Sequence, residues 1–169
     1  MTISIRDRVH TIIDSPIGPL RLVATDGVLS GLYMDAQRHL PDDVSSGPDD
    51  PGSFAEATRQ LREYFAGERT DFDLPLALEG TAFQQRVWAA LREIPFGQTW
   101  SYGQLAAHIG SPGASRAVGL ANGRNPVSVI VPCHRVIGAD GRLTGYGGGL
   151  ERKRLLLDLE RRHTGVQLF

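Results

Sequence analysis

The chain has 169 residues, a net charge of −1 and 41% hydrophobic residues, enough apolar material for one large domain or two small ones. No stretch approaches the roughly 20 apolar residues that a membrane-spanning helix needs, so we expect no membrane association. The first eight residues lack the apolar centre of a signal peptide, and a single cysteine suits a reducing compartment. We therefore expect a cytoplasmic protein.

Charge is divided unevenly along the chain. Residues 1–80 carry 7 Arg or Lys against 14 Asp or Glu, whereas residues 81–169 carry 11 against 5. We expect two domains with a boundary at residue 80. A basic half joined to an acidic half indicates a polyanionic partner for the C-terminal half, and charge scattered for solubility is the alternative.

The first part of the chain predicts a small antiparallel sheet. Short apolar strands are expected over 9–14, 20–25 and 28–34. The last two are separated by Asp26-Gly27, a strong signal for a tight hairpin turn.

The rest of the N-terminal half predicts one helix between two irregular segments. Residues 35–52 are polar and contain three prolines, which is typical of a loop. Apolar residues at helical spacing predict a helix over 54–66, and residues 71–80 read as an extended link. No reactive cluster is evident in this half, so we expect it to be a scaffold.

The C-terminal half predicts mainly helices. Thr81 is a suitable N-cap for a helix over 82–93, and Ser101 for a short helix that ends at Ile109. A glycine-containing turn leads to another helix over 114–121. Two short helices joined in this way form a helix-turn-helix pattern, although many helical hairpins bind nothing.

The second helix of this pair is rich in small residues. Its candidate base-reading side chains are few, mainly Arg116, Asn122 and Arg124. Small residues suit close approach to the minor groove and binding with little sequence preference. Tight packing against another helix is the alternative interpretation.

The segments that follow lead to the single cysteine and the C-terminus. Residues 127–131 are apolar and predict a buried strand or extended segment that delivers Cys133. The last helix is expected over 150–163, with Leu155, Leu156 and Leu159 facing inward.

Cys133 limits the chemistry that is available. A solitary thiol cannot form an intramolecular disulfide or a multi-thiolate metal site. It can act as a nucleophile that captures a group covalently. The alternative is a small buried hydrophobic residue.

Four motifs resemble those of the O6-alkylguanine-DNA alkyltransferases, also called methylated-DNA–protein-cysteine methyltransferases. In chain order and spacing they are Ser101-Tyr102-Gly103, Arg116-Ala117-Val118-Gly119, Asn125-Pro126 and Pro132-Cys133-His134-Arg135-Val136. The resemblance covers essentially residues 81–169. It implies an α+β fold, with a small N-terminal antiparallel sheet and one helix, then a mainly helical C-terminal domain with a winged helix-turn-helix.

The resemblance also implies a reaction. The alkyl group of O6-alkylguanine, chiefly O6-methylguanine with O4-methylthymine as a second substrate, passes irreversibly to Cys133, once per molecule. His134 accepts a proton through a bridging water, and Glu160 orients His134, which gives the logic of a catalytic triad. No cofactor is expected.

By the same resemblance, the damaged base is flipped out of the duplex. Arg116 fills the vacated space, and Tyr102 displaces the 3′ phosphate and contacts the base. The implied DNA contacts are Tyr102, Arg116, Ala117, Gly119 and Ala121.

The lesion pocket is expected to lie beside Cys133, with Asn125 holding the turn beneath that residue. Gly147 stands where some relatives have serine, so a backbone N–H would contact O6 there. The role of Arg135 stays open between a structural residue and a phosphate contact. The implied pocket residues are Tyr102, Val136, Leu143, Tyr146, Gly147 and Gly148.

We expect no metal site, because residues 1–132 have no cysteine and only scattered histidines. The expected partner is double-stranded DNA bearing O6-alkylguanine, bound through the minor groove by a monomer. Whether monomers bind cooperatively stays open.

Two other functions compete with this interpretation. A non-catalytic lesion-binding protein of the alkyltransferase-like type typically has another residue, often Trp, in place of Cys133. A cysteine hydrolase would use Cys133, His134 and Glu160 over many turnovers.

Overall fold

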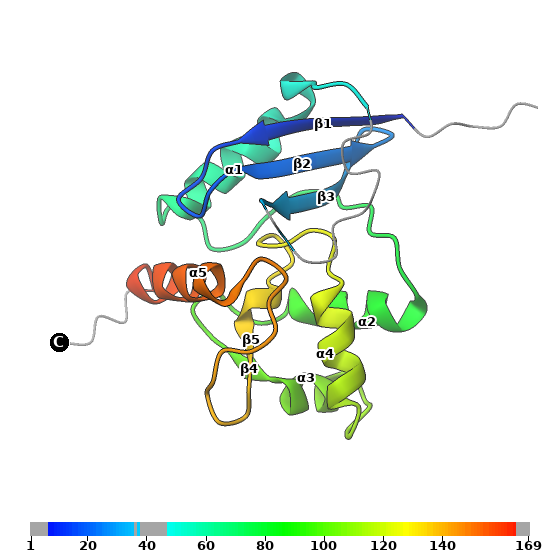
Figure 1. Cartoon of the computed structure of the whole chain (residues 1–169), viewed down its shortest axis with the longest axis vertical. Helices are drawn as coiled ribbons and strands as arrows, with labels where there is room; N and C mark the ends of the chain where they lie inside the picture. Colours follow the sequence, from blue (N-terminus) through cyan, green and yellow to red (C-terminus); the bar gives the residue numbers. More distant parts are fainter. Residues whose placement is uncertain (1–6, 36, 38–46, 165–169) are drawn as a thin grey trace, which may run out of the picture.

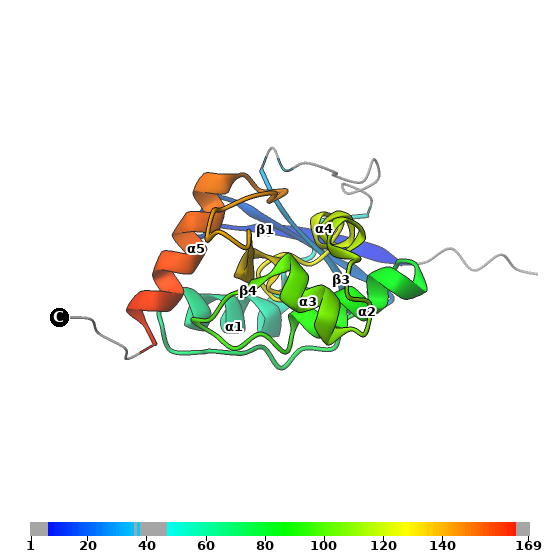
Figure 2. The same cartoon turned by 90° about the horizontal axis from the view of Figure 1, so that it is seen from below.

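The structure, a computed structural model, describes residues 7–35, 37 and 47–164. A three-stranded sheet and helix α1 form one end of the molecule, and α3 and α4 lie at the other (Figure 1). Seen from that second end, α3 and α4 are in front and α1 lies behind them (Figure 2). The predicted α+β fold is confirmed.

The sheet has the order β1-β2-β3, and all of its pairs are antiparallel. Its strands are β1 (Arg8–Ile13), β2 (Leu20–Thr25) and β3 (Val28–Met34), close to the predicted ranges. Asp26 and Gly27 both have positive φ, 51° and 82°, as the tight turn between twisted antiparallel strands requires.

Helix α1 (Ala55–Phe65) follows a short 3-10 turn, η1 (Pro51–Phe54), and confirms the predicted helix to within one residue at each end. The link after it is extended, as expected, and Ala77 N donates to Leu29 O of β3. The predicted loop over 35–52 lies only partly within the described residues.

Capping explains the starts of α2 and α3. Helix α2 (Ala82–Leu91) begins after Thr81, whose hydroxyl accepts from the N–H of Gln84 while the Gln84 side chain accepts from the N–H of Thr81. Ser101 and Gln104 repeat this reciprocal pair before α3 (Tyr102–His108).

The remaining C-terminal elements complete the fold. Helix α4 is Ser115–Gly123, α5 is Leu150–Arg162, and η2 is a 3-10 turn over Cys133–Arg135. Two very short strands, β4 (Trp100–Ser101) and β5 (Val136–Ile137), pair in parallel.

Two local predictions are wrong. Residues 127–131 are buried, but beyond one bridge between Val127 and Leu32 they form turns, and Val131 N donates to Val127 O. In α5, Leu155 is 44% exposed, and Leu157 is buried together with Leu156 and Leu159. Because α5 is covered on one side only, a run of three leucines leaves one of them facing outward.

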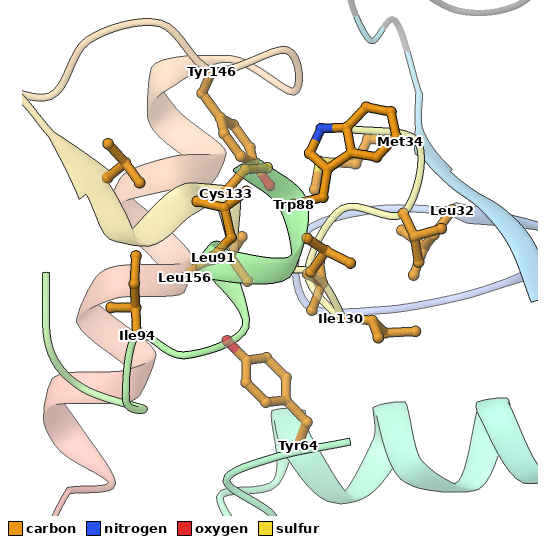
Figure 3. Packing of buried hydrophobic residues seen from close by; sticks show 14 of the residues in the cluster. Leu32, Met34, Tyr64, Trp88, Leu91, Ile94, Ile130, Cys133, Tyr146 and Leu156 are labelled. Atoms are coloured by element: carbon orange, nitrogen blue, oxygen red, sulfur yellow. The ribbon is translucent and has the colours of Figure 1, made fainter. Parts of the chain in front are cut away.

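The two halves share one hydrophobic core. Leu32, Met34 and Tyr64 from the N-terminal half lie in the same cluster as Trp88 and Cys133 (Figure 3). Across the described residues, no helix is long and apolar enough to cross a membrane.

Candidate active site

Cys133 is the first residue of η2 and is 4% exposed. In Figure 3 its side chain lies near the ring of Tyr146, with Trp88 and Leu91 of α2 close by. Burial raises the pKa of the Cys133 thiol, while Asn125, the Lys153 ammonium and Ser128 act in the opposite direction. The thiol therefore needs a proton acceptor before it can act as a nucleophile.

The segment that presents Cys133 is held by one amide and by the edge of the sheet. Asn125 Nδ2 donates to Val131 O at 2.7 Å, and Asn125 Oδ1 accepts from Val127 N at 3.0 Å. From the N-terminal half, Leu32 N donates to Pro126 O at 2.9 Å. Asn125 thus lies where the motif suggested, closing the turn before the cysteine.

Val129 lies within this turn in an unusual conformation. Its φ is 73°, in the left-handed region that costs a residue with a Cβ roughly 1–2 kcal/mol. The side chain is fully buried, which offsets that cost. Strained backbone of this kind is common next to functional residues.

His134 follows Cys133 and contacts Glu160 of α5. The distance from His134 Nε2 to Glu160 Oε2 is 2.6 Å, and both side chains are fully buried. Burial lowers the pKa of His134, while the Glu160 carboxylate raises it. A neutral imidazole that donates from Nε2 to the carboxylate has a bare Nδ1, which can accept a proton.

Glu160 carries its charge inside the protein. Burial alone would raise the pKa of this carboxyl, but hydrogen bonds and charge from His134 and Arg135 hold the pKa far below its usual range. Arg135 Nε donates to Oε1 at 2.9 Å, and Arg135 Nη2 to Oε2 at 3.0 Å. The backbone N of Gly97 also donates to Oε1, at 3.1 Å.

Arg135 makes its contacts inside the protein. Its side chain is 7% exposed, and its third contact is from Nη1 to Ile94 O at 2.7 Å. Its guanidinium is therefore held by Glu160 and by the turn after α2. These contacts favour the structural role over the phosphate contact.

Three buried side-chain atoms have no hydrogen-bond partner among the described residues: His134 Nδ1, Asn122 Oδ1 and Tyr146 OH. Asn122 Nδ2 donates to Cys133 O at 3.4 Å, and Tyr146 lies beside Cys133 (Figure 3). Unpaired buried polar groups are rare in folded proteins and gather at functional sites. The sequence offered Asn122 as a base-reading side chain, but it is only 2% exposed and points toward Cys133, so it is not available to DNA.

The predicted DNA-contact residues of the helix pair differ in how exposed they are. Arg116 and Ala117 are exposed on α4, and Gly119 lies against Tyr102, since a Cβ there would be 3.7 Å from the ring. Ala121 is only 3% exposed and packs in the core, so its side chain is not available to DNA. The exposed neighbour is Leu120, which is 70% exposed and was not predicted.

Two residues from distant parts of the chain, Tyr102 and Thr144, lie together among the predicted pocket residues. Tyr102 OH donates to Thr144 O at 3.1 Å. Val136 and Tyr146 are buried, and Leu143, Gly147 and Gly148 are half-buried on the same loop as Thr144.

Lys153 of α5, which was not predicted as a site residue, ties together two of the segments that carry the predicted pocket residues. It is fully buried, and its Nζ donates to Val136 O at 2.5 Å and to Thr144 O at 2.7 Å. Burial lowers the pKa of Lys153 to about 8. No group of three metal-binding side chains occurs within the described part of the chain.

Comparisons with known proteins cover nearly the whole chain. Residues 82–162 match a family model described as 6-O-methylguanine DNA methyltransferase, DNA binding domain, and residues 9–78 match its ribonuclease-like domain. A Mycobacterium bovis protein named methylated-DNA–protein-cysteine methyltransferase is 59% identical over 156 residues, covering 92% of this chain and 94% of that protein. A protein of the same name from Methanosarcina acetivorans is 53% identical over 154 residues, covering 89% and 97%.

Solved structures agree with this result. A crystal structure of Mycobacterium tuberculosis OGT in complex with DNA has a TM-score of 0.88 to this structure at 59% identity, covering 92% of this chain and 94% of that one.

Replacing Glu160 by Gln should destabilise the protein in a pH-dependent way. At pH 7 we expect a loss of about 3–5 kcal/mol in the free energy of unfolding, because the buried Arg135 loses its counter-charge. The folded carboxyl has a depressed pKa, so its stabilisation is present above the ordinary value of 4.5 and is lost as the pH falls further. The gap between wild type and Glu160→Gln should therefore narrow below that pH.

Urea unfolding at several pH values measures this gap. Glu151→Gln, which changes an exposed glutamate on the same helix, is the matched control and should cost little at any pH. A gap for Glu160→Gln that stays constant with pH would contradict the ionised state of Glu160.

Proposed function

This chain belongs to the 6-O-methylguanine DNA methyltransferase family, and we propose that Cys133 accepts the alkyl group from O6-alkylguanine in DNA. The protein thereby repairs alkylated DNA. One observation carries the assignment to Cys133: the thiol is followed by a buried imidazole that is tied to a carboxylate through Nε2 and has a free Nδ1.

The reaction is a displacement at the alkyl carbon. A bond forms between the Cys133 sulfur and that carbon while the bond from carbon to O6 breaks, and the electron pair leaves with guanine. The thiol proton passes through a bridging water to His134 Nδ1, and Glu160 stabilises the resulting imidazolium. Guanine takes up a proton in turn. A thioether is a poor leaving group, so each molecule reacts once.

DNA binds at the α3–α4 pair, through the minor groove. Arg116 and Ala117 are exposed on α4, and small residues allow its backbone to approach the groove closely. Arg116 enters the stack in place of the flipped base, and Tyr102 turns toward the phosphate and the base. Within the described residues, the exposed Leu120 adds an apolar contact on the same helix.

The flipped base occupies the space between Cys133 and the 143–148 loop. Val136, Leu143 and Tyr146 supply apolar walls, and the backbone at Gly147 and Gly148 supplies N–H donors. Guanine O6 accepts a hydrogen bond there as negative charge develops on the leaving base. The reactive thiol needs a reducing compartment, which supports action in the cytoplasm, and the protein acts as a monomer.

A non-catalytic lesion-binding function, the alternative that the sequence left open, is not favoured. The helix pair serves either function, but a non-catalytic function leaves the Cys133–His134–Glu160 arrangement without a use. Intact mass after incubation with methylated DNA distinguishes the two, because only transfer adds a lasting methyl group.

Cys133→Ser should abolish alkyl transfer and leave DNA affinity within a few fold of wild type. The serine hydroxyl is a far weaker nucleophile, while the helix pair supplies the binding. Intact mass measures the transfer, and equilibrium titration of a fluorescent duplex measures the binding. Methyl addition to Cys133→Ser would refute Cys133 as the acceptor.

Binding through the minor groove should be sensitive to salt and tolerant of sequence. Affinity for several unrelated duplexes should fall in parallel as salt rises, because arginine side chains displace counterions from the phosphates. Bulky groups on the major-groove edges of the bases should leave affinity unchanged. A sharp preference for one duplex, or a loss of affinity with those groups, would instead indicate major-groove binding.

Arg116→Ala should slow repair of duplex DNA about tenfold or more at saturating protein, because extrusion of the base costs a few kcal/mol. Reaction with free O6-benzylguanine should change little, since a free base needs no extrusion. The measurement is the single-turnover rate on each substrate. Arg154→Ala, which removes an exposed arginine of α5, is the control.

Equal losses on both substrates would mean that the change has damaged the pocket. A defect on duplex that vanishes at saturating protein would make Arg116 a phosphate contact only.

A further inference from the structure

Tyr64 brings the N-terminal half into contact with the candidate active site. It lies on α1 and is fully buried, and its hydroxyl donates to Glu160 Oε2 at 2.6 Å across 96 residues of sequence. Figure 3 shows the ring extending from α1 toward the interior with the hydroxyl leading. The contact therefore joins the presumed scaffold to the carboxylate that orients His134.

The ring of Tyr64 is held in place by other aromatic side chains. Its centroid lies 5.2 Å from that of Phe65, 5.3 Å from that of Phe72 and 6.0 Å from that of Phe96. Burial, followed by the charge of Glu160, raises the pKa of Tyr64 well above its ordinary value, so the hydroxyl stays protonated. It can therefore act as a fixed donor to the carboxylate.

We propose that Tyr64 is a positioning residue for alkyl transfer, which sets how strongly Glu160 acts on His134 by sharing the same carboxylate oxygen. The proposal rests on the proposed function of Cys133 and His134. It assigns to the N-terminal half a part in the reaction that its sequence did not indicate.

The sharing follows from the geometry at Glu160 Oε2. This oxygen accepts from Tyr64 OH at 2.6 Å, from His134 Nε2 at 2.6 Å and from Arg135 Nη2 at 3.0 Å. Each further donor takes up part of the negative charge, so the carboxylate becomes a weaker base toward His134. The imidazole then stays neutral in the resting protein and keeps Nδ1 free for the Cys133 proton.

Other groups act on His134 in the same site. Arg135 and Lys153 lower its pKa by charge, and Glu160 raises it. These contacts are present with or without the Tyr64 hydroxyl. Removal of that hydroxyl therefore changes one donor to Oε2 and leaves the other titratable groups in place, which are Cys133, His134, Arg135, Tyr146, Lys153 and Glu160.

Tyr64→Phe tests the proposal because it keeps the ring and removes only the donor. Glu160 then becomes a stronger base toward His134, which raises the pKa of the imidazole. Since protonated His134 cannot accept the Cys133 proton, the acid limb of the rate profile should move to higher pH. We expect a shift of about 0.5–1 pH unit, which is roughly a 3- to 10-fold loss of rate on that limb.

The experiment measures single-turnover rates with free O6-benzylguanine between acidic and alkaline pH, so that base flipping plays no part. At alkaline pH, Tyr64→Phe should match wild type within about twofold. Nuclear magnetic resonance of the His134 ring nitrogens should show the same shift in the unreacted protein. Tyr33→Phe, which removes a hydroxyl from a buried tyrosine of β3, is the matched control and should shift neither profile.

A fluorinated tyrosine at position 64 tests the opposite direction. Fluorine makes the hydroxyl a stronger donor, so the acid limb and the His134 titration should both move to lower pH. This variant keeps the hydrogen bond and provides the test if Tyr64→Phe does not fold.

Unchanged rate and titration profiles in a folded Tyr64→Phe protein would make Tyr64 a core residue only and overturn the proposal. An equal loss of rate at every pH would also overturn it, because a displaced Glu160 slows the reaction without moving the titration. Failure of the proposed function is recognised separately. In that case wild type gains no alkyl group at Cys133, while the His134 titration still reports on Tyr64.

Discussion

The rest of the structure depends on the hydrogen bonds and ion pair that the buried Glu160 carboxylate makes. An ion removed from water is costly unless donors replace its hydration. Here the donors are Tyr64 from α1, Gly97 from the turn after α2, and His134 and Arg135 from η2. Three segments distant in sequence therefore meet at one side chain of α5, and His134, one of the donors that satisfy the carboxylate, is held beside Cys133 by that contact.

The turn before Cys133 sets the directions of the Cys133 and His134 side chains. An extended chain would place the side chains of Cys133 and His134 on opposite sides. Instead, Asn125 closes a compact turn, Val129 adopts a positive φ, and η2 begins at Cys133. The 3-10 turn allows the thiol to face Tyr146 while His134 faces α5. A sequence of β-branched residues predicts a strand here because its local preference is real, and the hydrogen bonds of Asn125 and the edge of β3 override that preference.

Local signals were therefore the predictable part of the fold. The reciprocal caps at Thr81 and Ser101 and the Asp26-Gly27 turn involve neighbouring residues, and their elements lie close to where the sequence places them. Which side chains of a helix face the core was less predictable. Ala121 is buried and Leu155 is exposed because of where other elements cover their helices, and their residue types do not reveal this. The family motifs drew attention to Cys133, His134 and Glu160, but no local pattern could link Tyr64 to Glu160. That contact depends on how the two halves pack.

Two separate groups of hydrogen bonds lie between Cys133 and the two ends of the molecule. Toward α3 and α4, Thr144 O accepts from both Tyr102 OH and Lys153 Nζ. Lys153 Nζ also donates to Val136 O, so Tyr102, which is proposed to contact DNA, shares an acceptor with this lysine. Toward α1, Glu160 receives Tyr64 and orients His134. The first group reaches the surface, because Tyr102 is half-buried and Thr144 is exposed, whereas the second is buried throughout. A site built in this way can admit a base on one side while the proton acceptor on the other keeps its geometry.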